Sequence, residues 1–453
     1  MQNDNAFLGT EKIGKLLFRL ALPAVTAQLV NMLYNLVDRI YIGHIPGAGT
    51  LALTGVGVCM PLILLISAFA ALVSMGAAPR ASICMGEGDY SSAERILGNS
   101  FTLLLIVAAV LTPVFTIWRD ELLLAFGATE NTLPFASDYM GIYALGTVFV
   151  QLALGLNAFI TAQGYAKISM FTVLIGAACN IALDPVFIFG FNMGVRGAAL
   201  ATILSQAISA TWVLAFLLGK RTTLRIKTEN MRLVPKLILP CVALGLAPFI
   251  MQSTESVLNI CFNTSLRNYG GDLAVGAMTI LLSVMQLAML PLQGLTQGAQ
   301  PIISFNFGAR NRARVKEGFT LLLKCCMTYS TVLWLAVMIV PEVFAGMFTP
   351  DPALIEYSAW AARIYMAVSL IFGIQIACQQ TFIAIGNAKA SLFLACLRKL
   401  ILLIPLIYIL PQIFADKVMA VYLAEPVADI IAVSITALLF AKQFKKALAE
   451  MEN

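Results

Sequence analysis

The sequence contains long apolar runs without a single charged side chain. No Asp, Glu, Lys or Arg occurs between Arg95 and Arg119, between Arg196 and Lys220, or between Lys236 and Glu255. Each run is close to the roughly 20 residues that a helix needs to cross the hydrocarbon core of a bilayer. Of the 453 residues, 60% are hydrophobic and only 11% are charged, unlike soluble domains. These features predict an all-α polytopic membrane protein.

The spacing of the runs predicts twelve transmembrane helices, with both ends of the chain on one side of the membrane. Of the 29 Lys and Arg residues, we assign 21 to the side of the chain ends, four to the other side and four to the interior of spans. Because basic residues concentrate in cytoplasmic loops, both termini are predicted to be cytoplasmic. The expected spans are residues 16–42, 52–78, 95–118, 134–161, 167–190, 196–219, 235–262, 274–298, 317–340, 354–383, 390–412 and 417–441.

Short motifs recur in the two halves of the chain. The GAAP motif at 76–79 returns as GAQP at 298–301, and GYAKIS at 164–169 returns as GNAKAS at 386–391. In both pairs the second copy lies the same number of residues after the first, from 76 to 298 and from 164 to 386. We call this spacing the main offset. A fixed offset between several motifs indicates a duplicated unit.

Nearer the start of each half, the offset is slightly shorter. Pro23 then matches Pro240, and Asp38 matches Glu255 at the same spacing, which we call the first-helix offset. Six spans are an even number, so both halves cross the membrane in the same direction, as in secondary transporters built from parallel repeats. We expect a six-helix lobe at residues 1–219, a basic cytoplasmic linker at 220–236 and a second six-helix lobe at 237–453.

Three segments together resemble one known family. They are LALPAVTAQLVNMLYNLVDRIYIG at 20–43, NIALDPVFIFGFNMGVRGAALATILSQ at 180–206 and AIGNAKAS at 384–391. The chain resembles the multidrug and toxic compound extrusion (MATE) transporters over essentially its whole length, and it is most similar to the bacterial multidrug-efflux branch with an acidic first helix.

Four polar residues of the first half are predicted to form a cation site. Asp38, Asp184 and Thr202 fall at a similar depth in spans 1, 5 and 6, and Asn180 lies one turn from Asp184 on the same helix face. Carboxylate, amide and hydroxyl oxygens suit Na⁺, and two close carboxylates could instead share a proton. Carboxylates are costly within hydrocarbon, which favours function over a polar network that only fixes packing. The family resemblance also implies that these four residues form the cation site of this lobe.

The second half departs from this pattern. Glu255 takes the place of Asp38, but the segment that matches 180–184 is LLIPL at 402–406, with neither Asn nor Asp. Span 10 offers Gln375 and Gln379 where some relatives carry an acid. Glu255, Gln375 and Gln379 are therefore candidates for attracting a cationic substrate or coupling it to the ion. The alternative is that Glu255 is an acid satisfied by neighbouring Gln and Ser side chains.

Four charged residues fall within the last two spans. Arg398 and Lys399 lie in span 11, and Glu425 and Asp429 are spaced i,i+4 in span 12, at similar depth. We expect them to neutralise one another as an intramembrane charge network, either structural or moving during transport.

A proline lies within the first helix of each half. Pro23 and Pro240 each free a backbone carbonyl and allow a bend. The resemblance implies that such a bend accompanies ion binding, and a static kink is the alternative.

The predicted function is a secondary antiporter of the cell membrane that exports amphipathic, often cationic drugs in exchange for Na⁺ or H⁺, by rocking of two lobes. The partners are small molecules and the lipid bilayer, with no nucleic acid, no cofactor and a monomeric state. The alternative is a lipid-linked oligosaccharide flippase of related architecture, whose phosphate cargo fits the acidic residues less well. A single histidine disfavours an enzyme with a hydrolytic triad.

Overall fold

The computed structural model describes residues 6–451, which form helices joined by turns, bends and irregular connections and contain no strand. The helices are α1 (Phe7–Thr10), α2 (Ile13–Gly43), α3 (Gly49–Gly86), α4 (Tyr90–Ile117), α5 (Arg119–Ala125), α6 (Leu133–Leu145), α7 (Thr147–Ala162), α8 (Ala166–Pro185), η1 (Val186–Gly190), α9 (Val195–Leu218), η2 (Thr228–Asn230), α10 (Pro235–Gly308), α11 (Arg312–Ile339), α12 (Pro341–Gly346), α13 (Pro352–Tyr365), η3 (Ser369–Ile371), α14 (Phe372–Ala384), α15 (Ala388–Cys396), η4 (Leu397–Leu403), α16 (Ile404–Ile413) and α17 (Lys417–Glu450).

The twelve expected spans are confirmed. Nine helical segments of the described residues are long and apolar enough to cross a membrane, and two bent pairs, α6–α7 and α13–α14, add one span each. The long α10 is two helices joined at Gly271, whose backbone is non-helical with φ 66° and ψ −160°. Only glycine adopts this conformation readily, so it divides α10 into spans 7 and 8.

The structure differs from the expected spans in helix continuity. Spans 4 and 10 are not single straight helices, because α6 and α7 are bent by 59° and α13 and α14 by 53°. The first bend lies at Gly146, between α6 and α7. Span 5 ends in the π-helix η1, and span 11 contains the π-helix η4. Hydropathy averaged over a window does not report such local breaks.

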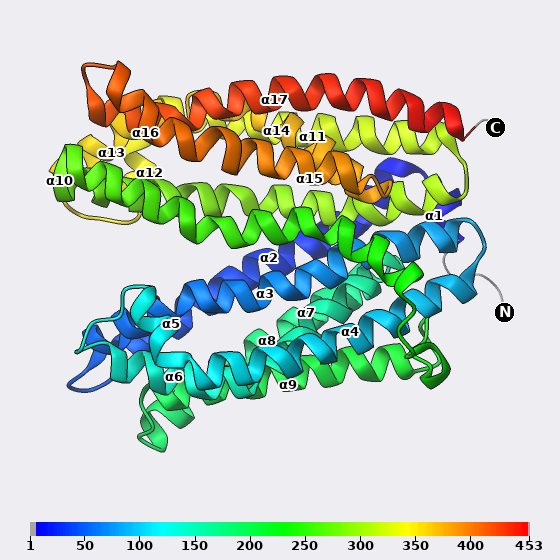
Figure 1. The fold of residues 1–453 in the computed structure, drawn as a ribbon, viewed down its shortest axis with the longest axis horizontal. Coiled ribbons are helices and arrows are strands. Elements are labelled where there is room, and N and C mark those ends of the chain that lie inside the picture. The colour runs from blue at the N-terminus through cyan, green and yellow to red at the C-terminus, as the bar shows by residue number, and fades with distance from the viewer. Residues whose placement is uncertain (1–5, 452–453) are drawn as a thin grey trace.

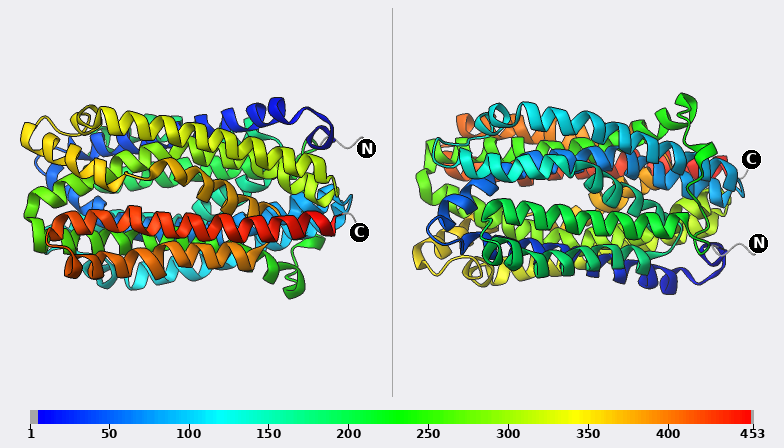
Figure 2. Two further views of the ribbon diagram at one scale, coloured as in Figure 1. Left: turned by 90° about the horizontal axis from the view of Figure 1, so that it is seen from above. Right: turned by 90° about the horizontal axis from the view of Figure 1, so that it is seen from below.

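The two halves of the chain form two bundles that lie side by side. In Figure 1 the helices from α2 to α9 lie below those from α10 to α17, and the bundles diverge away from the chain ends. Both ends of the described chain lie at the same end of the molecule in every view (Figure 2). The outermost residues of the two predicted lobes, 1–5 and 452–453, lie outside the described residues.

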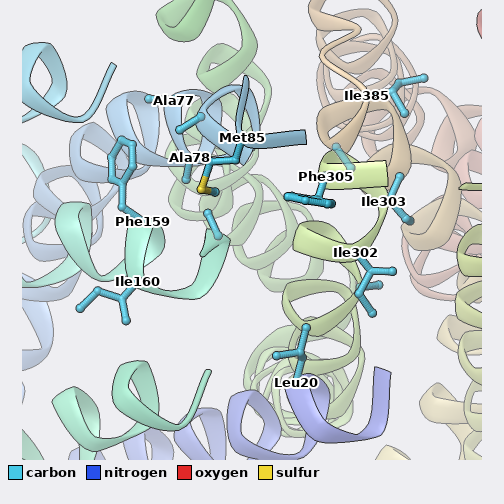
Figure 3. Packing of buried hydrophobic residues seen from close by; sticks show 14 of the residues in the cluster. Leu20, Ala77, Ala78, Met85, Phe159, Ile160, Ile302, Ile303, Phe305 and Ile385 are labelled. Carbon is cyan, nitrogen blue, oxygen red and sulfur yellow. The ribbon is translucent and has the colours of Figure 1, made fainter. Parts of the chain in front are cut away.

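Three clusters of buried apolar residues follow this arrangement. One draws on both halves and includes Leu20, Phe159, Ile302 and Phe305 (Figure 3). A second is confined to buried residues between 42 and 203, and a third to buried residues between 258 and 428. The halves therefore share a core toward the chain ends and have separate cores elsewhere.

Glycines bring the two halves into backbone contact within this shared region. A Cβ on Gly86 would lie 2.0 Å from the carbonyl oxygen of Phe305, and one on Gly308 would lie 2.0 Å from that of Ile83. Positions 86 and 308 are equivalent at the main offset, as are 83 and 305. The contact is therefore reciprocal, which is the property of an interface around a two-fold axis.

Candidate cation and substrate sites

The helices α2, α8 and α9 bring together the four residues predicted as a cation site. Asn180 and Asp184 lie one turn apart on α8 and are almost completely buried, at 1% and 0% exposed. The Asn180 Nδ2 atom donates to Asp184 Oδ1 at 3.5 Å and to Thr202 Oγ1 at 3.4 Å. The carboxyl groups of Asp38 and Asp184 lie close enough to interact electrostatically.

Three buried oxygen atoms of this cluster have no hydrogen-bond partner: Asp38 Oδ1, Asn180 Oδ1 and Asp184 Oδ2. Buried acceptors without a donor are costly, and two adjacent carboxylates repel each other. A proton shared by the carboxylates, or a monovalent cation held by hard oxygens, would relieve both costs. The donor set therefore fits Na⁺ or H⁺ as a transported ion.

Three tyrosines near this cluster were missed by the sequence reasoning as site residues. Tyr34 lies one turn before Asp38 on α2, which the i,i+4 spacing could have indicated. Tyr139 of α6 lies close to Thr202. Tyr143 stacks on Tyr139 with ring centroids 6.1 Å apart. Nothing in the sequence indicates that Tyr139 lies close to Thr202.

A small cavity adjoins the cluster and extends toward the end of the molecule that holds the chain ends. Its volume is about 60 Å³, and its polar lining includes Tyr34, Asn157, Asn180, Thr202 and Ser205. A drug-sized ligand needs about 300–1,000 Å³, whereas one water needs about 10–15 Å³. This cavity therefore has room for an ion and a few waters, and not for a drug.

In the second half, Glu255 has a charged partner that the sequence reasoning did not assign to it. Its carboxylate forms an ion pair with the ammonium group of Lys399, which also donates to the Met251 carbonyl oxygen at 2.7 Å. The Lys399 side chain is 5% exposed and the Glu255 side chain is 51% exposed. This acid is thus held by a lysine rather than by Gln and Ser side chains.

Gln375 and Gln379 lie beside this ion pair, on α14. Gln375 donates to Gln379 at 3.2 Å and accepts from Thr436 at 2.6 Å. Gln379 donates to the sulfur of Met251 at 3.2 Å. Both glutamines line a second cavity, of about 40 Å³, together with Lys399.

The charged residues of spans 11 and 12 divide between two partners. Arg398 donates to Glu425 at 2.6 Å and to Asp429 at 2.7 Å, and its guanidinium lies 4.7 Å from the centroid of the Phe372 ring. Lys399 forms its ion pair outside the hairpin, with Glu255. The expected network of four charges is therefore a triad plus a separate pair.

The two prolines lie inside continuous helices. α2 continues through Pro23, and α10 continues through Pro240. Pro23 is buried in the first helix, about four turns before Asp38.

Two six-span halves that cross the membrane in the same direction form the parallel-repeat architecture that many secondary transporters share. Comparison with known families also identifies a transporter family. The MatE family model matches the chain twice, over residues 23–186 and 248–409. The chain therefore belongs to the MatE family, which confirms the resemblance seen in the sequence, and the double match agrees with the internal repeat.

Similar proteins extend over nearly the same length. The chain is 26% identical to the multidrug export protein MepA of Staphylococcus aureus strain N315, covering 94% of each chain. It is 24% identical to MepA of Staphylococcus haemolyticus strain JCSC1435, covering 96% of each.

Solved structures share the fold. The MATE multidrug transporter DinF-BH is 33% identical with a TM-score of 0.88, covering 96% of each chain. A MATE in the bent conformation is 22% identical with a TM-score of 0.92, covering 99% of each. An outward-facing multidrug resistance MATE family transporter of the MOP superfamily is also 22% identical, with a TM-score of 0.91 and 99% coverage of each.

Proposed function

We propose that this protein is a secondary antiporter that exports amphipathic, often cationic compounds in exchange for inward movement of Na⁺ or H⁺. The observation that carries the proposal is the cluster of Asp38, Asn180, Asp184 and Thr202, with three buried oxygens that lack a donor. Membership of the MatE family and the names of its multidrug-exporting relatives support the substrate class. No cofactor is required by this mechanism.

The proposed topology places both termini in the cytoplasm and the protein in the cell membrane, as a monomer that contains both lobes. The distribution of basic residues supports this orientation. The bundles then diverge toward the outside, and the small molecule is released there by rocking of the lobes.

Cation binding drives export in this scheme. Entry of one monovalent cation down 100 mV in exchange for an uncharged solute supplies about 2.3 kcal/mol, enough to concentrate that solute roughly 40-fold. A cation held by Asp38 and Asp184 in the first lobe favours the conformation that releases the substrate. Coupling requires that the two conformations differ in affinity for both ligands.

The test is ethidium transport in proteoliposomes, with a Na⁺ gradient and a pH gradient imposed separately. We expect one gradient to drive transport by the wild type and Asp184→Asn to reduce it by roughly one to two orders of magnitude, because coupling of about 1–3 kcal/mol is lost. Asp138→Asn is the matched control, since Asp138 pairs with Arg196 at 2.8 Å and is 39% exposed.

Two results would contradict the proposal. Wild-type protein that transports under neither gradient would exclude antiport of these ions. Full gradient-driven transport by Asp184→Asn would show that this carboxylate only stabilises the fold.

A further inference from the structure

The second cavity occupies the place in the second half that the first cavity occupies in the first half. Moving lining positions 153, 154, 157, 172, 173, 176 and 177 by the main offset gives 375, 376, 379, 394, 395, 398 and 399, all of which line the second cavity. Moving Tyr34 by the first-helix offset gives another lining residue, Met251. These offsets come from motifs elsewhere in the chain, so the agreement is an independent sign that the two cavities are equivalent.

The equivalent cavities differ sharply in charge. Positions 176 and 177 are Gly176 and Ala177 in the first half, whereas their counterparts are Arg398 and Lys399. The first half therefore has no charged side chain where the second half has two cationic ones. Arg398 is taken up by Glu425 and Asp429, which leaves Lys399 as the cation that faces Glu255.

Glu255 is the counterpart of Asp38 at the first-helix offset. The Lys399 ammonium is bound by this carboxylate and by the carbonyl of Met251, the counterpart of Tyr34. The counterparts of Asn180 and Asp184 are Leu402 and Leu406. The second half thus holds one acid and one tethered cation at the place where the first half holds two acids.

We propose that Glu255 and Lys399 form the second half's version of the cation site, in which the lysine ammonium permanently takes the place of the exchangeable cation. The proposal deepens the proposed function, because it rests on the first-half cluster being the exchangeable site. Only the first lobe then exchanges a cation with the medium. Lys399 is the residue that excludes a second exchangeable cation.

Truncation of Lys399 should therefore open a cation site beside Glu255. Lys399→Ala keeps the Cβ atom and removes three carbons and the ammonium group, the structure of n-propylammonium. The half-exposed Glu255 side chain gives such a cation a route to the carboxylate. The probe is n-propylammonium, with 1-propanol as the neutral control.

The experiment measures the thermal midpoint of the full-length protein in detergent micelles. We expect Lys399→Ala to melt below the wild type, and propylammonium to raise its midpoint by several degrees more than it raises that of the wild type. Propanol should not have this effect. In Lys399→Ala/Glu255→Gln the extra stabilisation should disappear, because the carboxylate that binds the cation is gone.

Four outcomes would overturn the proposal, three of them in the melting experiment. In the first, propylammonium raises the midpoint of Lys399→Ala no more than that of the wild type. In the second, it raises the midpoint of Lys399→Ala no more than propanol does. In the third, it stabilises the double variant as much as it stabilises Lys399→Ala. If Lys399→Ala can be purified only in propylammonium, that recovery supports the site. If neither solute recovers it while the double variant folds, the site does not accept a free cation and the proposal is overturned.

The same measurement separates this proposal from the function of the first lobe. The stabilisation of Lys399→Ala by propylammonium should persist when Asp184→Asn is added, because the two sites lie in different lobes. Failure of Asp184→Asn to impair export would overturn the proposed antiport and leave the propylammonium result unaffected.

Discussion

At the scale of single residues, two neighbouring cations serve different partners. Arg398 and Lys399 are adjacent in η4, so their side chains leave the helix in different directions. Arg398 therefore faces α17, while Lys399 faces α10. A reading of the last two spans alone assigns both cations to Glu425 and Asp429, because the approach of α10 cannot be read from that segment.

The triad of Arg398, Glu425 and Asp429 leads to a stability prediction. Their side chains are 13%, 6% and 5% exposed. Arg398→Met leaves two buried acids without their cation, so we expect it to cost about 3–5 kcal/mol and to lower the thermal midpoint in detergent micelles. Adding Glu425→Gln and Asp429→Asn should restore most of the loss, because no buried acid is then left without its cation.

Arg363 provides the matched control for this prediction. It pairs with Glu342 at 3.6 Å, with side chains 51% and 53% exposed. An exposed pair contributes about 0–1 kcal/mol, so Arg363→Met should melt close to the wild type. Equal effects of the two substitutions would contradict a buried charge triad.

At the scale of helices, the sequence predicts some features of the site and not others. The i,i+4 spacing of Asn180 and Asp184 placed both on one face of α8, and comparison of depths added Asp38 and Thr202. The spans followed from uncharged runs because desolvation of charges dominates insertion into a bilayer. The bend at Gly146 and the contact of Tyr139 with Thr202 depend on tertiary packing, which periodicity does not encode.

The close approach of α3 and α10 gives a prediction at this scale. A Cβ on Gly76 would lie 1.9 Å from the carbonyl oxygen of Cys241 and 2.6 Å from the amide nitrogen of Gly245. Neither backbone atom can rotate away, so we expect Gly76→Ala to cost about 1–3 kcal/mol and to lower the thermal midpoint.

Gly57 lies on the same helix and is the control. A Cβ at Gly57 has no neighbour within 4 Å, so Gly57→Ala should be neutral or stabilising by about 0.5–1 kcal/mol. If Gly76→Ala melted like Gly57→Ala, the two helices would not approach each other as closely as described.

At the scale of the whole molecule, the cores determine how the lobes can move. The apolar cluster shared by both halves joins them toward the chain ends, and the other two clusters each stay within one half. In the proposed rocking, each of these two clusters would move with its own half, and the shared cluster would be the region about which the lobes turn. The duplication seen in the sequence predicted two lobes, but the conformation in which they are joined depends on contacts between distant segments.

Phe69 of α3 and Phe249 of α10 form a ring contact between the lobes, with centroids 5.0 Å apart. In a cysteine-free background that retains export, we expect a short, reducible bis-thiol cross-linker between Phe69→Cys and Phe249→Cys to stop gradient-driven ethidium export. Rocking must separate these positions, and reduction should restore transport.

The control pair is Phe319→Cys and Phe444→Cys on α11 and α17, whose rings lie 5.1 Å apart within one lobe. Cross-linking there should leave export intact. Continued export with the first pair cross-linked would mean that the lobes keep this contact throughout the cycle, and rocking about the shared core would be excluded.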